Sequence, residues 1–132
     1  MFVQFPDLMA SVAAALNQSG LPATMLHGSV HVKTAALESM QKETLGEDEP
    51  RILMLSLADE SAAGANLAMC NHVFIVHALL TETAQEYHAF ETQAIGRALR
   101  YGQTKTVHIL RFIVDGTADR EILDQRKSQI TA

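Results

Sequence analysis

The sequence has a single cysteine, Cys70, among its 132 residues. One thiol excludes an internal disulfide bond and a cysteine-based zinc site, and it fits a reducing compartment. No apolar run approaches the roughly 20 residues that a membrane-spanning helix needs. The first residues, MFVQFPDLM, lack the basic and apolar regions of a secretory signal peptide. We therefore expect neither secretion nor a membrane partner.

Two phosphate-binding motifs are also absent. The chain contains no G-x-x-x-x-G-K-[ST] and no G-x-G-x-x-G, the loops that hold nucleotide and dinucleotide phosphates. Its formal net charge is −5, so the chain as a whole does not attract nucleic acid. Contacts with nucleic acid must therefore be local, or shared with another domain.

The residues that are present predict a globular α/β domain. Apolar residues make up 48% of the chain and charged residues 19%, and the length is sufficient for a hydrophobic core. Apolar runs that predict strands alternate with segments of helical spacing that predict helices. The expected strands are 2–5, 23–29, 51–57, 72–78 and 106–114, and the expected helices are 6–20, 32–43, 81–102 and 117–129. This alternation predicts a three-layer domain, with a mainly parallel sheet of five or six strands and helices on both faces. The runs at 51–57, 72–78 and 106–114 are typical of buried strands.

One helix end, QAIGRALRYGQ, has an unusual pattern of polar residues. Gln93, Arg97 and Arg100 are spaced i, i+4 and i+7, which places them on one helix face. Gly96 lies between them and permits close approach of a ligand or a backbone. Two guanidinium groups on one face could clamp phosphates. The alternative is an ordinary solvated arginine face, and the spacing alone leaves both interpretations open.

Histidines offer no convincing metal site. His27 and His31 are four residues apart but have no cysteine or carboxylate partners at ligand spacing. His72, His77 and His108 fall at or within expected strands, where strand-end or core histidines are common. No metal ligand is therefore assigned.

Four segments resemble the SWI/SNF-type DNA-dependent ATPases, a branch of the superfamily-two helicases. The segment QAIGRALRYGQTKTVHILRFIVDGTADREIL resembles motif VI and its sequel, and RILMLSLADESAAGANLAMCNHVFIVHA resembles motif V. The segment ATMLHGSVHVKTAALESMQ resembles a strand, a turn and a helix that precede motif V, and FVQFPDLMASVAAAL resembles the strand and helix that open the same lobe. The resemblance covers nearly the whole chain, in the family's order.

The resemblance implies that residues 1–132 are a single helicase C-terminal domain, the second RecA-like lobe of a larger two-lobe ATPase. The N-terminal lobe would be its partner and would hold the phosphate-binding loop and the Mg-binding acids, with ATP bound between the lobes. The expected function is that of an ATP-dependent DNA translocase in chromatin remodelling or DNA repair, acting on duplex DNA in the nucleus. The isolated lobe is expected to be an inactive monomer.

The resemblance also implies roles for individual residues. Arg97 and Arg100 match the arginine fingers that reach the γ-phosphate of ATP. The other expected nucleotide-binding residues are Gln93, Gly96, Gly64 and Asn66. The expected DNA-binding residues are Gly28, Ser29 and Ser56.

Departures from the family pattern lie in and after motif V. The stretch from Ser56 to Asn66 is one residue longer than the pattern, its paired glycines are replaced, and Asp59 and Glu60 make it acidic. The sequence HALLTETAQEYHA stands where the family has D-P-x-W-N-P. These changes favour an alternative function, a catalytically degenerate lobe that acts as a protein-interaction or regulatory module. An unrelated α/β enzyme is a third hypothesis, but the chain shows no nucleophile–base pair or metal set for it.

Overall fold

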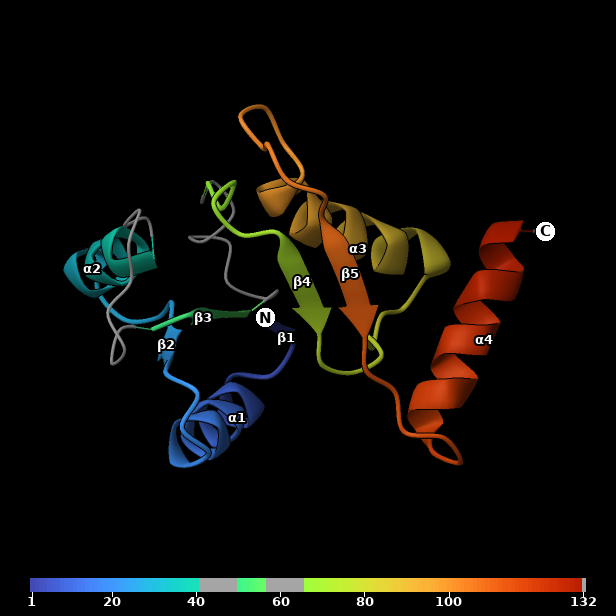
Figure 1. Cartoon of the computed structure of the whole chain (residues 1–132). Helices are drawn as coiled ribbons and strands as arrows, with labels where there is room; N and C mark the ends of the chain where they lie inside the picture. The colour runs from blue at the N-terminus through green and yellow to red at the C-terminus, as the bar shows by residue number, and fades with distance from the viewer. Residues whose placement is uncertain (41–49, 57–65, 132) are drawn as a thin grey trace. The chain divides into compact units, whose positions relative to one another are not determined.

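In the computed structural model, strands and helices alternate along the chain (Figure 1). The structure describes residues 1–40, 50–56 and 66–131. They form two compact units, one of Met1 with Val3–Ala62 and the other of Phe2 with Ala63–Ala132, and each is described by itself. The elements are β1 Phe2–Val3, α1 Pro6–Gln18, β2 Ala23–Met25, α2 Val30–Met40, β3 Ile52–Ser56, β4 His72–Ile75, α3 Ala84–Ala98, β5 His108–Arg111 and α4 Ala118–Thr131.

The hydrogen-bonded order of the strands is β2-β3-β1-β4-β5, and β1–β4, β2–β3 and β4–β5 are parallel pairs. The expected α/β fold with a mainly parallel sheet is therefore confirmed, with five strands. The first two residues of the chain, Met1 and Phe2, belong to different units. The Met1 carbonyl accepts a hydrogen bond from the Leu55 amide at 2.9 Å in the first unit, and the Phe2 carbonyl accepts one from the Val76 amide at 3.2 Å in the second.

In the first unit, β2 and β3 pair in the register Ala23↔Ile52 to Met25↔Met54. Helix α1 begins at Pro6, where the missing amide hydrogen costs nothing because first-turn amides have no helical partner. Helix α1 contacts β2 and β3, and α2 contacts β3; the two helices lie on opposite sides of these strands (Figure 1). The buried apolar residues of this unit are Val3, Met9, Ala13, Leu26, Ala36, Met40, Leu53, Met54 and Leu55.

In the second unit, α3 packs on β4, and α4 packs on α3 (Figure 1). Thr83 caps α3: its hydroxyl accepts a hydrogen bond from the Glu86 amide at 3.1 Å, while the Glu86 carboxylate accepts one from the Glu82 amide at 3.2 Å. Such reciprocal bonds satisfy amides that the first helical turn leaves without partners. The buried apolar residues of this unit are Phe2, Leu67, Val73, Ile75, Ala78, Leu79, Tyr87, Ala94, Ala98 and Leu123.

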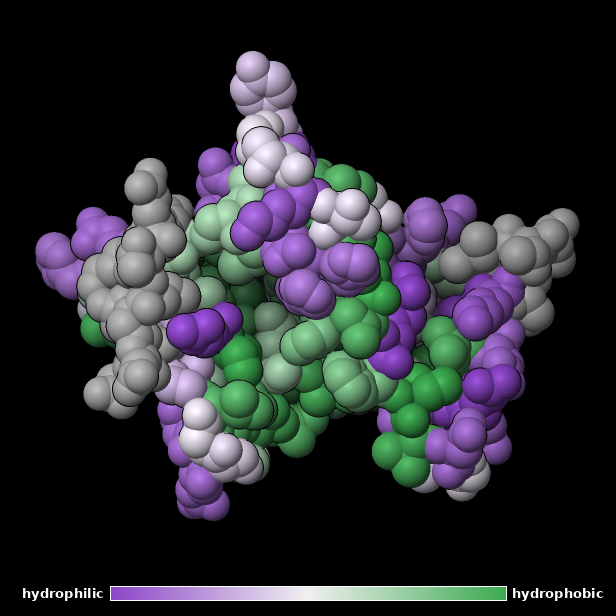
Figure 2. Space-filling model, viewed as in Figure 1, coloured by the Kyte–Doolittle hydropathy of each residue, from purple (hydrophilic) through white to green (hydrophobic). Residues whose placement is uncertain are grey.

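Strand β5 differs from the sequence prediction, because all four of its residues are exposed rather than buried. It is the last strand in the sheet order and has one neighbouring strand, β4. His72 stacks on His108 with ring centroids 5.0 Å apart, and Phe74 meets Phe112 edge-on at 5.7 Å, so these four rings share one face. In the view of Figure 1, no described helix of the second unit lies in front of these two strands. Figure 2 shows hydrophilic surface over the upper part of β4 and β5 and hydrophobic surface over their lower part.

No helix in the described part of the chain combines the length and the apolar character needed to cross a membrane.

Candidate functional site

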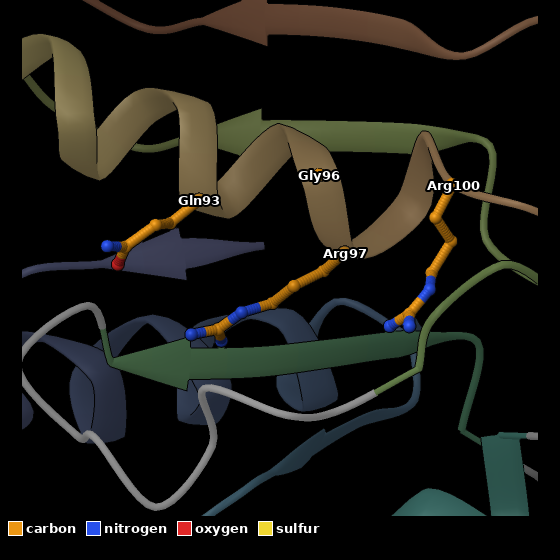
Figure 3. A pocket seen from close by; sticks show the side chains of 4 residues that line it. All are labelled: Gln93, Gly96, Arg97 and Arg100. Atoms are coloured by element: carbon orange, nitrogen blue, oxygen red, sulfur yellow. The ribbon is translucent and has the colours of Figure 1, made fainter.

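The C-terminal half of α3 borders an open hollow of about 430 Å³. Its lining residues are Gln93, Gly96, Arg97 and Arg100, four of the residues that the resemblance assigns to nucleotide binding. Figure 3 shows the three long side chains extending to the same side of the helix, as the i, i+4, i+7 spacing predicts. The described residues around the hollow thus present two guanidinium groups and one amide, a set of donors that suits a polyanion such as a phosphate chain.

Arg97 is buried, with 6% of its surface exposed. Its guanidinium carbon lies 5.5 Å from the centroid of the Phe2 ring, within the range of a cation–π contact, and Phe2 is itself 3% exposed. The interpretation of this helix end as an ordinary solvated arginine face therefore does not hold for Arg97. Helical spacing gave no sign of this burial, because Phe2 is distant from Arg97 in the sequence.

Arg100 and Gly96 are both exposed. Arg100 comes after the last residue of α3, Ala98, and its side chain reaches the hollow from the turn that follows the helix (Figure 3). A Cβ atom built on Gly96 meets no described atom within 4 Å. The backbone of α3 therefore leaves open space beside the two arginines, where a ligand could approach.

Asn66 belongs to a turn that is hydrogen-bonded to the end of α3. Its side-chain oxygen accepts a hydrogen bond from the Ala68 amide at 3.1 Å. The next residue, Leu67, donates its amide hydrogen to the Arg97 carbonyl at 3.0 Å. The structure thus brings Asn66 close to the arginine-bearing helix end. Gly64, the other motif V candidate, lies outside the described residues.

The expected DNA-binding residues lie in the first unit, at the ends of β2 and β3. Gly28 has φ +89°, a left-handed conformation that glycine adopts without strain. The Ser29 hydroxyl accepts a hydrogen bond from the Val32 amide at 3.4 Å at the start of α2. Ser56 ends β3 and is 5% exposed, whereas Gly28 and Ser29 are exposed. Because β2 and β3 are parallel, all three residues lie at the same edge of the strand pair, where ligands of such sheets bind.

Gln103 is a structurally important residue that the sequence interpretation left without a role. Its side-chain amide nitrogen donates to the Cys70 carbonyl at 2.9 Å and to the Ala98 carbonyl at 3.0 Å. Its side-chain oxygen accepts a hydrogen bond from the Lys105 amide at 3.0 Å. The available sequence signal was its position directly after Gly102, because a side chain just beyond a helix end can bind the free carbonyls of the last turn. In the structure, Gly102 has φ +96°.

A second polar group lies on the buried face of α3. The Arg111 guanidinium pairs with the Glu91 carboxylate, which raises the pKa of Arg111. Burial, together with the nearby Glu91 charge, raises the pKa of Tyr87 to about 12.

Burial also raises the pKa of the Cys70 thiol. In the described ranges, no group of three or more histidine, cysteine or acidic residues could hold a metal ion.

Comparisons with known proteins identify relatives in sequence and in fold. No protein-family model matches the chain. The chain is 38% identical over 130 residues to the DNA (cytosine-5-)-methyltransferase DMT5 of Cryptococcus neoformans var. grubii, covering 98% of this chain and 5% of that protein. It is 31% identical over 131 residues to the DNA repair protein RAD5 of Cryptococcus neoformans var. neoformans, covering 98% of this chain and 10% of that protein.

Among solved structures, the C-terminal part of the Fun30 ATPase domain matches with a TM-score of 0.72 and 22% sequence identity. The match covers 93% of this chain and 36% of that one. The fold is therefore shared with a C-terminal ATPase lobe, while the chain spans only 5% and 10% of the lengths of the two relatives.

Proposed function

Because the chain belongs to the SWI/SNF-type helicase-like ATPases and has the fold of their C-terminal lobe, we propose that it completes the ATP site of a DNA-translocating enzyme. The observation that supports this proposal is the hollow beside α3, which Gln93, Arg97 and Arg100 line. Their positive charge and hydrogen-bond donors suit the phosphate chain of a nucleotide.

In this proposal the chain supplies charge rather than a nucleophile. Cleavage of the bond between the γ-phosphoryl group of ATP and the leaving phosphate would place negative charge on the leaving oxygen, with the rest spread over the three equatorial oxygens of the transferred group. Arg100 and Arg97 stabilise that charge, and fixed donors of this kind are effective because they need no reorganisation during the reaction. Gln93 contacts the nucleotide or orients the guanidinium groups.

The remaining parts of the site belong to a second lobe. This sequence has no phosphate-binding loop of the G-x-x-x-x-G-K-[ST] type, and the described residues form no metal-binding group. The residues therefore fit the phosphates of ATP but not its Mg²⁺, which an N-terminal lobe would hold. The partner of this lobe in the proposal is thus the N-terminal lobe of the same polypeptide.

The proposed substrate of the intact protein is duplex DNA in the nucleus, in repair or chromatin remodelling. The names of both relatives, a DNA repair protein and a DNA methyltransferase, support DNA as the common target. Gly28, Ser29 and Ser56 remain the proposed contacts with the DNA backbone, and Gly64 and Asn66 the proposed motif V contacts with nucleotide.

The test is the DNA-stimulated ATPase activity of the full-length protein. We expect Arg100→Ala to lower kcat by about 10³-fold or more, as removal of an arginine finger does. Arg51→Ala is the matched control, since Arg51 is exposed and precedes β3 in the other unit. Full activity of the Arg100→Ala protein, or equal losses in both variants, would refute the proposal.

A second candidate function is that of a protein-interaction module without catalysis. The exposed apolar residues on and beyond β5, among them Leu110, Phe112 and Val114, favour it, because large exposed apolar patches often mark interaction sites. This function predicts that the full-length protein hydrolyses no ATP and that Leu110→Lys abolishes partner binding. An ATPase that depends on Arg100 excludes it as the sole function.

A further inference from the structure

The turn that carries Arg100 is held by one residue, Gln103. Arg100 lies outside α3, so helical hydrogen bonds do not fix its backbone. The Gln103 amide donates to the Arg100 carbonyl at 3.0 Å and closes the turn through Gly102. The Gln103 side chain then ties this turn back to the helix through the Ala98 carbonyl at 3.0 Å.

The same side chain fixes the turn to a second segment. Its other donor bond goes to the Cys70 carbonyl at 2.9 Å, and the Leu67 amide of that segment donates to the Arg97 carbonyl at 3.0 Å. Bonds from Gln103 and Leu67 thus satisfy the carbonyls of Arg97, Ala98 and Arg100. Each of the two arginines therefore has its main-chain position set by a bond from outside α3.

We propose that Gln103 is a positioning residue that holds Arg100 at the hollow. Its two donor bonds, one acceptor bond and main-chain bond make the turn rigid, so that the Arg100 guanidinium is already placed when a phosphate arrives. Without Gln103, the exposed arginine would sample many conformations, and ordering it would lower its contribution to the reaction. The proposal rests on the proposed function, because it assigns the positioning to the reaction that Arg100 serves.

The test compares the binding of ADP with that of ADP–aluminium fluoride, a transition-state analogue, to the full-length protein with Mg²⁺ present. An interaction made mainly in the transition state strengthens analogue binding more than ADP binding. We expect Gln103→Ala to weaken the analogue at least tenfold and to change the Kd of ADP by less than about twofold. Gln103→Glu should behave similarly, since a carboxylate keeps the acceptor bond from Lys105 but loses both donor bonds.

A double variant separates positioning from a general structural role. If Gln103 acts through Arg100, adding Gln103→Ala to an Arg100→Ala protein should weaken the analogue no further, within about twofold. If Gln103 has a general structural role instead, Gln103→Ala lowers the melting temperature. The double variant then loses analogue affinity by the product of the two single-variant factors. The matched control is Gln85→Ala, which alters an exposed glutamine in the first turn of α3 and should leave both affinities unchanged.

The outcomes distinguish the two proposals. If Arg100→Ala leaves analogue binding unchanged, the proposed function fails, and the role of Gln103 fails with it. If Arg100→Ala weakens the analogue while Gln103→Ala does not, or if the two losses multiply, only the role of Gln103 is overturned. A loss of ADP and analogue affinity by the same factor in Gln103→Ala also overturns it.

Discussion

Arg111 binds Glu91 through two parallel hydrogen bonds, from Nε to Oε1 at 2.6 Å and from Nη2 to Oε2 at 2.9 Å. The pair joins β5 to the buried face of α3. The Glu91 carboxylate is thus bound by Arg111, whereas Gln93, Arg97 and Arg100 line the hollow.

The Glu91–Arg111 pair should contribute measurably to stability. Glu91 is 8% exposed, so Arg111→Ala leaves a buried carboxylate without its cation, which is costly. Because the Arg111 side chain is 39% exposed, water offsets part of this cost, and we expect a loss of about 1–3 kcal/mol in the free energy of unfolding. The control is Arg120→Ala, which breaks an exposed i, i+4 pair with Asp124 and should cost no more than about 0.5 kcal/mol. Urea melts measure both; equal losses would contradict the prediction.

Tyr87 should make the stability of the chain fall at high pH. Its pKa is raised to about 12 in the folded chain by burial and by Glu91, whereas an unfolded tyrosine titrates near 10. The stabilisation is therefore complete below about pH 10 and is lost as the pH rises toward 12, by up to about 1.4 kcal/mol per pH unit, because only the unfolded chain releases the proton.

Tyr87→Phe removes this proton. The curve of unfolding free energy against pH should therefore be flatter between about pH 10 and 12 than that of the unchanged chain. Tyr101→Phe is the control, since Tyr101 is fully exposed and should leave the curve as it is. Urea melts between pH 8 and 12 give the comparison. A Tyr87→Phe curve that parallels that of the unchanged chain would rule out the coupling.

The two site arginines should differ in their effect on folding. Arg100→Ala alters an exposed residue and should change the free energy of unfolding by no more than about 0.5 kcal/mol. Arg97→Ala removes a buried side chain and its contact with Phe2, and we expect a loss of about 1–3 kcal/mol. Thermal melts of the 132-residue chain test this. Indistinguishable melting temperatures would contradict this prediction. Because Arg100→Ala is expected to leave folding nearly unchanged, Arg100 is the better residue for testing catalysis.

The 132-residue chain alone should hydrolyse no ATP, with or without DNA, because half of the proposed ATP site is absent. Turnover that disappears with Arg100→Ala would disprove this. Its binding to duplex DNA should also be weak and salt-sensitive, with Kd weaker than about 10⁻⁶ M at physiological salt, because the net charge is −5. Fluorescence anisotropy with labelled duplex measures the affinity, and a salt-resistant sub-micromolar complex is the contrary result.

The sequence predicted the order and type of the elements because their signals are local. The apolar run that became β3 is such a signal, and β3 lies within the expected range 51–57. Helix α3 is shorter than the expected range 81–102, because it ends at Ala98 and leaves Arg100 in the turn that follows. Spacing alone predicted that the side chains of Gln93, Arg97 and Arg100 extend to the same side, although Arg100 lies in the turn after α3. Resemblance then supplied the chemistry of that face, which spacing had left open between a phosphate clamp and a solvated surface.

Three features lay beyond such signals for a common reason. The burial of Arg97 depends on Phe2, the role of Gln103 depends on main-chain carbonyls, and the exposure of β5 depends on which helix covers it. Contacts distant in sequence leave no periodicity, and a carbonyl acceptor has no side chain to identify it. The apolar residues of 106–114 show that the segment favours a strand, but they do not show whether anything covers both faces.

The placement of the hollow at the carboxyl end of α3 determines how it can attract an anion. Phosphates commonly bind at helix amino termini, where the backbone contributes partial positive charge. The carboxyl end of a helix bears a partial charge of about −0.5, so here the backbone opposes a phosphate. Among the described residues that line the hollow, the guanidinium groups of Arg97 and Arg100 supply the attraction. Neutralising both would remove the positive charge that the described lining residues supply, and raising the ionic strength would screen the attraction at the exposed Arg100 more than at the buried Arg97.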